Sequence, residues 1–401
     1  MSLITVIVLW GTSAYSSTGP PPICMHFSPI GIFGGAVPAR SSRRQWTQKR
    51  VRLAASAWDC SACENPACLA TSNASASGSW ESDSLDAQWT AEFPLVGPAG
   101  EVIDLRRVFL SHGIAELPPM RLDQKVWTFE ITVPLAGVGA RTLTIAQARP
   151  GHGLISVKDQ SSTPKLGVAV MAQVRYVLSL DLDLTPFYGV ASEDPDLAWV
   201  LEGAGRMVRS PTVFEDVVKT ICTTNTSWGG TTRMVNALVQ HLGEKAPGAP
   251  DGSPYGRAFP TPQAMAAAPD HFYKKVAGAG YRGPYLKALS TDVARGRVDL
   301  ESLATTSRDD LPDDDVAAKL QALPGVGPYA AAHIMLMLGR YDRLILDSWT
   351  RPTYARLLGK KRPVSDRSIV RRFKRYGPYA GLAFWLFLTR DWLTDDSQPI
   401  L

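Results

Sequence analysis

The sequence predicts an α+β protein in which a small, mostly antiparallel β domain precedes an all-helical domain. Between residues 86 and 183, short stretches rich in β-branched and apolar residues are separated by glycine and proline, as in a sheet of short strands. After Asp183, apolar residues recur every three to four positions, as on the buried face of a helix. With 401 residues, of which 45% are hydrophobic and 20% charged, the chain is long enough for two such domains. Fibrous and wholly disordered classes are excluded.

Residues 1–85 are predicted to be a disordered or targeting extension. Residues 1–58 contain no Asp or Glu and are rich in Ser, Gly, Pro and Arg, a composition that cannot bury enough apolar surface to fold. The same composition resembles an organellar transit peptide; an over-long gene start is the alternative. Cys60, Cys63 and Cys68 follow, but a structural zinc site needs four ligands, so we expect no metal there.

The β domain is predicted over residues 86–183. A short helix over 103–112 is expected to end at Gly113, because glycine readily adopts the backbone conformation that closes helices. Strands are predicted over residues 88–95, 126–135, 142–149, 153–157 and 168–180.

The helical domain is predicted over residues 184–401. Its first long helix starts at Ser210 and Pro211, because a hydroxyl caps free N–H groups and proline fits the first turn. Pro352 makes us expect a later helix to begin near Thr350, or to be kinked. Further helices are predicted to end at Gly243, to start at Thr261, and to cover residues 284–295, 312–322, 328–338, 351–358, 365–376 and 378–392.

Residues 323–327 read Leu-Pro-Gly-Val-Gly and lie between two predicted helices. Two glycines allow a tight turn and bare the N–H groups at the start of the next helix, which can bind an anion. The pattern predicts a helix-hairpin-helix that holds DNA phosphates without reading sequence, with Leu323, Gly325, Val326 and Gly327 at the contact. The alternative is an ordinary glycine-rich connector.

An apolar run, residues 344–346, ends in Asp347, twenty-two residues after Gly325 and just before a predicted helix. This spacing resembles the helix-hairpin-helix (HhH-GPD) DNA glycosylases, with a layout like that of the alkyladenine and 8-oxoguanine branches. In that family a catalytic Asp follows the hairpin at about this distance, so the resemblance implies that Asp347 is catalytic. On position alone Asp347 could instead cap the helix; both roles can coexist.

Three further segments carry the same resemblance, which covers roughly residues 86–392. They are Ile-Cys-Thr-Thr-Asn-Thr-Ser at 221–227, Gly-Tyr-Arg at 280–282 and Tyr-Gly-Pro-Tyr-Ala-Gly-Leu-Ala at 376–383. The resemblance implies a base-excision-repair enzyme that extrudes a damaged base from duplex DNA, with Asn225 filling the gap. Asn225 could also be a helix-end residue. Arg351 is a further candidate DNA contact.

The resemblance also indicates which chemistry and cofactors to expect. Asp347 would stabilise the oxocarbenium-like sugar as the base departs. Relatives that also cut the strand carry a Schiff-base lysine where this chain has Tyr329, so a monofunctional hydrolase is predicted. No cysteine follows Cys222, which excludes the iron–sulfur branch. We expect no cofactor other than a monovalent cation at the hairpin.

The substrate follows from the expected base pocket, formed by Tyr329, Phe384 and Trp228. In the 8-oxoguanine branch a glutamine and a phenylalanine of the last helix read the base, but Phe384 and Leu388 occupy those places here. An aromatic set suits cationic alkylated purines of the 3-methyladenine type. Phe384 could equally be a core residue, as we expect for Trp385. The alternatives are an 8-oxoguanine glycosylase with an altered pocket and a non-catalytic DNA-binding protein.

Charge and hydropathy bear on the partners. The net charge is +5, and residues 360–375 hold eight basic residues against one acidic residue, Asp366. Such a run can bind phosphates, although it can also be a solvated helix face. No apolar run reaches the roughly 18 residues of a membrane span. We expect a monomer that binds damaged double-stranded DNA, has no membrane contact, and works in the nucleus or a DNA-containing organelle.

Overall fold

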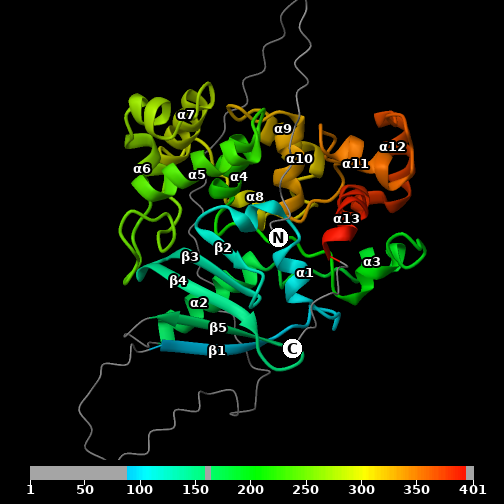
Figure 1. Cartoon of the computed structure of the whole chain (residues 1–401), viewed down its shortest axis with the longest axis horizontal. Coiled ribbons are helices and arrows are strands. Elements are labelled where there is room, and N and C mark those ends of the chain that lie inside the picture. Colours follow the sequence, from blue (N-terminus) through cyan, green and yellow to red (C-terminus); the bar gives the residue numbers. More distant parts are fainter. Residues whose placement is uncertain (1–87, 159–163, 394–401) are drawn as a thin grey trace, which may run out of the picture. The chain divides into compact units, whose positions relative to one another are not determined.

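A computed structural model of the chain describes residues 88–158 and 164–393. The expectations for the extension over residues 1–85, and for Cys60, Cys63 and Cys68, lie outside these residues. Within them, a five-stranded antiparallel sheet is followed by helices, which confirms the α+β prediction (Figure 1).

The sheet has the strand order β1-β5-β4-β3-β2. Alternation sets its register: Ile131 of the third strand lies opposite Leu143 on one side and Met120 on the other, and all three are buried. The prediction missed the four-residue second strand, which is too short to show alternation. The strands are β1 (Gln88–Pro94), β2 (Met120–Asp123), β3 (Thr128–Leu135), β4 (Gly139–Gln147) and β5 (His152–Lys158).

The prediction of a strand over residues 168–180 is wrong, because most of this segment belongs to a helix, α2 (Pro164–Val177). Leu166, Val170, Val174 and Val177 recur at helical spacing and are all buried, so one helical face packs inward. The β-branched residues that suggested a strand supply that face. Burial of a continuous apolar stripe here outweighs their modest preference for strands.

The remaining helices follow the predicted order (Figure 1). The predicted start of the first long helix at Ser210 and Pro211 is wrong, because Thr212 caps that helix and its first residue is Val213. Short helical turns separate some of them: η2 (Gly113–Glu116), η3 (Ala198–Glu202), η4 (Phe272–Val276) and η5 (Lys374–Tyr379). None of the described helices is long and apolar enough to cross a membrane. The helices are α1 (Leu105–Phe109), α3 (Thr185–Ala191), α4 (Val213–Thr223), α5 (Trp228–Leu242), α6 (Pro262–Ala267), α7 (Arg282–Ala294), α8 (Ser302–Thr305), α9 (Asp313–Gln321), α10 (Pro328–Met337), α11 (Thr350–Leu357), α12 (Asp366–Phe373) and α13 (Ala380–Leu393).

Two hydrophobic clusters organise the described residues. The first joins the sheet to the helices, since Ile131 of β3, Val217 of α4 and Ile334 of α10 all belong to it. The second is built mainly from α3, α11, α12 and α13. Tyr329, on the first turn of α10, packs against both clusters and therefore lies where they meet.

Candidate DNA-binding and catalytic site

The hairpin consists of α9, residues 323–327 and α10, and its two glycines have different roles. Gly325 has φ +82°, and a Cβ there would lie 2.9 Å from Tyr285, so only glycine fits. Gly327 has φ −95°, and a Cβ there would meet no atom within 4 Å. Leu323 and Val326 bury their side chains in the core. The hairpin is thus anchored from within and open at Gly327.

Free N–H groups cluster at this open side. Helix α10 starts with Pro328, which has no N–H, and its N-cap Gly327 has no capping side chain. Among the described residues, the N–H groups of Gly325, Gly327 and Tyr329 donate to no protein acceptor. Together with the positive end of the helix dipole, these free donors can attract an anion; phosphate binding by the hairpin stays a prediction.

The expected monovalent cation would need backbone carbonyl oxygens of the same turn. The Leu323 carbonyl accepts the Val326 N–H at 3.2 Å. A carbonyl oxygen has two lone pairs, so this bond leaves room for a cation. The cation stays a prediction, and no step below depends on it.

Replacing Gly327 with alanine should weaken binding to every duplex alike, damaged or not, by about tenfold, because one charge-assisted phosphate bond is lost. The open surroundings predict unchanged stability, which thermal unfolding would check. Gly189→Ala, at an equally open helical glycine, is the matched control. Fluorescence anisotropy measures the binding. Weakened binding of only one lesion would mean that the hairpin shapes the base pocket instead.

Asn225 sits in the tight turn between α4 and α5 with φ +45°, and its side chain is exposed. Its Nδ2 donates to the Tyr281 hydroxyl at 3.3 Å. The buried Arg282 donates to the Thr224 carbonyl and to its Oγ1, which fixes the turn. An exposed amide on a braced turn suits the predicted gap-filling role.

Two exposed tyrosines connect this turn to the hairpin, a feature that the sequence reasoning missed. Tyr281, which meets Asn225, packs edge-on against Tyr285 with 6.2 Å between ring centroids. Tyr285 in turn covers Gly325. The sequence spacing could have indicated this contact, because Tyr281 and Tyr285 are one helical turn apart after the Gly-Tyr-Arg motif. Asn225 and the hairpin therefore belong to one continuous surface.

Asp347 lies half-buried at the start of α11. Its Oδ1 accepts the N–H groups of Trp349 at 2.8 Å and Thr350 at 2.6 Å, and its own N–H donates to Thr350 Oγ1 at 2.8 Å. This is a reciprocal helix cap. Oδ2 accepts no hydrogen bond from the described part of the chain, so one oxygen caps while the other is available for chemistry.

The helix after Asp347 begins at Thr350, which confirms the prediction made from Pro352. Pro352 lies in the first turn, where a missing N–H costs no helical bond. Arg351, predicted to contact DNA, is paired with Asp366 through two bonds of 2.8 and 2.9 Å. The hydrogen bond to Asp366 raises the pKa of Arg351. To contact DNA, Arg351 would have to leave Asp366 and bind a phosphate instead.

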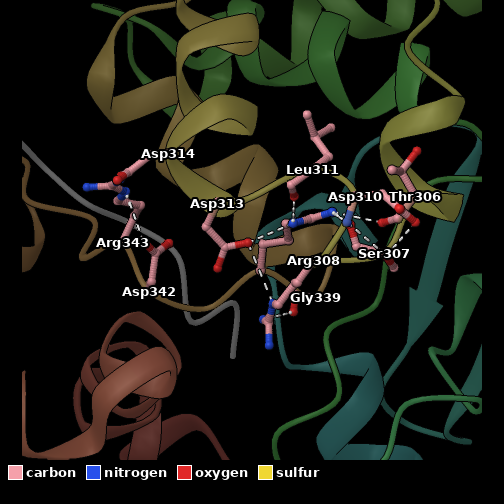
Figure 2. Close-up of polar contacts among 11 residues, drawn as sticks. Thr306, Ser307, Arg308, Asp310, Leu311, Asp313, Asp314, Gly339, Asp342 and Arg343 are labelled. Atoms are coloured by element: carbon pink, nitrogen blue, oxygen red, sulfur yellow. Dashed lines mark hydrogen bonds and ion pairs between the residues drawn. The ribbon is translucent and has the colours of Figure 1, made fainter.

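A buried arginine network holds the loop that leads to Asp347. Arg340 donates to the Leu311 carbonyl at 2.6 Å, to Asp313 at 2.8 Å and to the Thr306 carbonyl at 2.8 Å. Figure 2 shows these partners, with Arg308 donating to the Gly339 carbonyl at 2.8 Å. The segment before α9 is thereby tied to the end of α10.

Tyr329, on the first turn of α10, lies close to Asp347. Burial raises the pKa of Tyr329; a hydrogen bond with Thr223 lowers it, and the negative charge of Asp347 raises it further. Trp228 is half-buried against Gly113, since a Cβ on Gly113 would lie 3.3 Å from the indole ring. Tyr329 packs against His333, and Trp228 lies beside the residue that follows His112.

His112 and His333 form a buried histidine pair, which the sequence analysis did not single out. His112 Nε2 lies 3.1 Å from His333 Nδ1. The His333 ring packs edge-on against Tyr329 at 4.7 Å and Trp385 at 5.6 Å. Trp385 also stacks on His112 at 5.4 Å and donates from Nε1 to the Ser111 carbonyl at 2.8 Å.

Phe384 is not part of this aromatic region, contrary to the expectation that it lines the base pocket. It is fully buried in the second hydrophobic cluster, against Tyr354 and Phe373. Its neighbour Trp385 is a buried core residue, as expected, and it also packs against both rings of the histidine pair. Successive residues on a helix point about 100° apart, so a one-residue difference decides which side chain reaches the site.

The basic run is partly neutralised. Arg372 donates to Asp196 at 2.6 Å, and Arg375 pairs with Asp194, so these two are tied to the segment after α3. A cationic surface remains, formed by the exposed residues Lys360, Lys361, Arg362, Arg367, Arg371 and Lys374.

Burial lowers the pKa of both His112 and His333 to about 3, and repulsion from His333 adds to the shift at His112. A depressed histidine pKa means that the unfolded chain binds more protons between pH 6.5 and pH 3. The stability contributed is therefore present above pH 6.5 and is lost as the pH falls.

Acid should accordingly destabilise the wild type more than a His333→Phe variant. From pH 7 to pH 5 the unfolding free energy should fall by about 2 kcal/mol more in the wild type, measured by urea denaturation. Buried Glu215 and Asp216, with pKa values raised to about 7 and about 6, act in the opposite direction but equally in both proteins. Identical pH dependence would mean that His333 is not buried as described.

Among the described residues, no group of three or more His, Cys, Asp or Glu side chains is placed to hold a metal ion. No protein-family model matches the chain. No curated protein matches it.

Solved structures are similar to the chain over most of its length. One is the 3-methyladenine DNA-glycosylase from Archaeoglobus fulgidus, with 18% identity and a TM-score of 0.57, covering 77% of this chain and 99% of that one. Another is the apo form of the 8-oxoguanine glycosylase/lyase of Clostridium acetobutylicum, with 20% identity, a TM-score of 0.54, and 71% and 92% covered. That enzyme in complex with double-stranded DNA containing cytosine opposite 8-oxoG also matches, with 20% identity, a TM-score of 0.54, and 72% and 92% covered. The chain therefore has the fold of these DNA glycosylases.

Proposed function

Because the chain has the fold of the DNA glycosylases, we propose that it is a base-excision-repair enzyme that hydrolyses the N-glycosidic bond of a damaged purine. The observation that carries the proposal is Asp347: one oxygen is held by the helix cap, and the other accepts no hydrogen bond from the described residues. A cap alone needs only one oxygen. The open N–H groups of the hairpin supply the matching DNA contact.

The proposed mechanism uses residues already described. Backbone N–H groups near Gly327 hold a phosphate, and Asn225 enters the stack as the damaged nucleotide leaves it. The base is taken up beside Tyr329, Trp228 and Trp385. The bond from sugar C1′ to the base breaks with its electron pair going to the base. Asp347 stabilises the resulting cation and orients a water, which adds to C1′ and loses a proton, leaving an abasic site.

An alkylated purine of the 3-methyladenine type is the proposed substrate, acted on by a monomer in double-stranded DNA. Aromatic rings attract a cationic base, and histidines that stay uncharged do not repel it. The second candidate is an 8-oxoguanine glycosylase with an altered pocket, favoured by the similarity to the Clostridium enzyme. A DNA-binding protein without catalysis is the third.

A panel of duplexes separates the three. Each duplex carries one 7-methylguanine, 3-methyladenine, 8-oxoguanine opposite cytosine, or no lesion, and hot alkali reveals abasic sites. We expect release of methylated purines and little release of 8-oxoguanine. Efficient release of 8-oxoguanine alone would favour the second candidate, and lesion binding without release the third.

Strand cleavage should be absent, because Tyr329 stands where a lysine would form an imine. Borohydride added during turnover should trap no covalent complex with lesion DNA, as judged by a shifted band on a denaturing gel. An enzyme known to cleave the strand provides the positive control. A trapped adduct on any lysine would overturn the monofunctional assignment.

A further inference from the structure

The histidine pair joins two distant parts of the chain and has a defined proton arrangement. His112 precedes η2, and His333 lies in the middle of α10, 221 residues later. Each side chain is largely shielded, with 8% of its residue exposed. His112 Nδ1 accepts the Ile114 N–H at 3.4 Å, so the proton of the neutral ring must be on Nε2.

This arrangement determines the tautomer of His333. The Nε2–H of His112 donates to His333 Nδ1, which leaves the single proton of His333 on Nε2. That N–H is buried and has no hydrogen-bond partner among the described residues. A buried donor without an acceptor is costly, so a bound ligand that supplied an acceptor would gain a hydrogen bond there.

The surroundings of His333 are aromatic. Its ring packs edge-on against Tyr329 and Trp385, and Trp385 is itself fixed by its bond to the Ser111 carbonyl. Trp385 also packs against Trp349, with 5.9 Å between ring centroids, and the N–H of Trp349 donates to Asp347 Oδ1, so the same tryptophan pair connects the His333 ring to the carboxylate that would face the sugar. The N–H is therefore close to where the base of an extruded nucleotide would sit.

Resting on the proposed function, we propose that His333 Nε2–H donates to a ring nitrogen or carbonyl oxygen of the extruded purine. His112 is its positioning residue, which keeps the proton on the outer nitrogen. Because burial holds the pKa of both rings near 3, the donor is uncharged at neutral pH. It can therefore select an acceptor atom on a cationic alkylated purine without repelling it.

Binding to an uncleavable lesion tests the donor. The probe is a duplex in which a 2′-fluorinated nucleotide carries 7-methylguanine; the reference duplex carries a tetrahydrofuran abasic analogue at the same place. His333→Phe should weaken binding of the lesion duplex about tenfold and leave the reference duplex within about twofold. His333→Gln, which keeps an N–H donor, should recover part of the loss. His241→Phe, at an exposed histidine, is the control.

Nitrogen-15 NMR of the histidines tests the proton arrangement independently of affinity. We expect His333 protonated on Nε2 in the free protein, with this N–H moving downfield when the lesion duplex binds. His112→Phe should leave a mixture of His333 tautomers. An Nδ1-protonated His333, or an N–H signal that does not move when the lesion duplex binds, would overturn the proposal. This measurement uses the wild type, so it applies even if His333→Phe does not fold.

The failure of this inference can be told from failure of the proposed function. If the wild type releases methylated purines but His333→Phe affects both duplexes equally, or neither, only the role of His333 is wrong. If the wild type releases no base and does not prefer the lesion duplex over undamaged DNA, both are wrong.

Discussion

Asp347→Asn should bind lesion DNA almost as well as the wild type and release the base at least about 10²–10³-fold more slowly, because the charge that stabilises the sugar cation is removed. The structure makes this substitution unusually clean. The asparagine oxygen can still accept the N–H groups of Trp349 and Thr350, so the cap of α11 survives. Single-turnover kinetics, normalised to folded protein, measure the effect.

Asp347→Ala serves as the companion variant, since it removes both the charge and the cap. It should lose about 1 kcal/mol of stability in addition to activity. If Asp347→Asn releases the base at the wild-type rate, Asp347 is a cap only. The catalytic assignment would then be lost while the fold would stand.

Arg340→Met should lower the unfolding free energy by about 3 kcal/mol, because it leaves two partly buried carbonyls without this donor and Asp313 with only its longer, 3.5 Å ion pair to Arg308. The methionine can fill the volume but cannot donate. Base release per folded molecule should also fall, since Asp347 lies at the end of the loop that Arg340 anchors. Urea denaturation and single-turnover kinetics measure the two effects.

Arg343 provides the matched control in the same region (Figure 2). It pairs with Asp314, whose side chain is almost fully exposed, so Arg343→Ala should cost less than about 1 kcal/mol. Equal losses in the two variants would mean that the region tolerates removal of any arginine. The anchoring role of Arg340 would then be wrong.

The parts of the site that the sequence predicted are those with a local signal. The hairpin and Asp347 lie within 25 residues of each other, and glycine, proline and a capping carboxylate act on their own neighbours. Four of the five strands were found from alternation and from the glycines between them. The second strand was too short for this, and α2 was missed because its β-branched residues serve a helical face.

The features that could not be predicted from the sequence depend on contacts between segments that are far apart in the chain. Nothing near His112 or His333 in sequence indicates that the two rings meet. Likewise, Arg372 looked free to bind phosphate until the structure paired it with Asp196, 176 residues away. Phe384 and Trp385 are adjacent apolar residues of one helix, and only the packing around α13 decides which of them contacts the histidine pair.

The hydrophobic cluster shared by the sheet and the helices limits how the protein can be divided. Ile131, Val217 and Ile334 belong to the same cluster, so a fragment that starts after residue 183 would expose one face of it to water. Such a fragment would also lack His112 and the Ser111 carbonyl that holds Trp385. A hybrid enzyme that takes its helical part from a relative should therefore take the sheet from the same relative, because the two parts share one hydrophobic cluster.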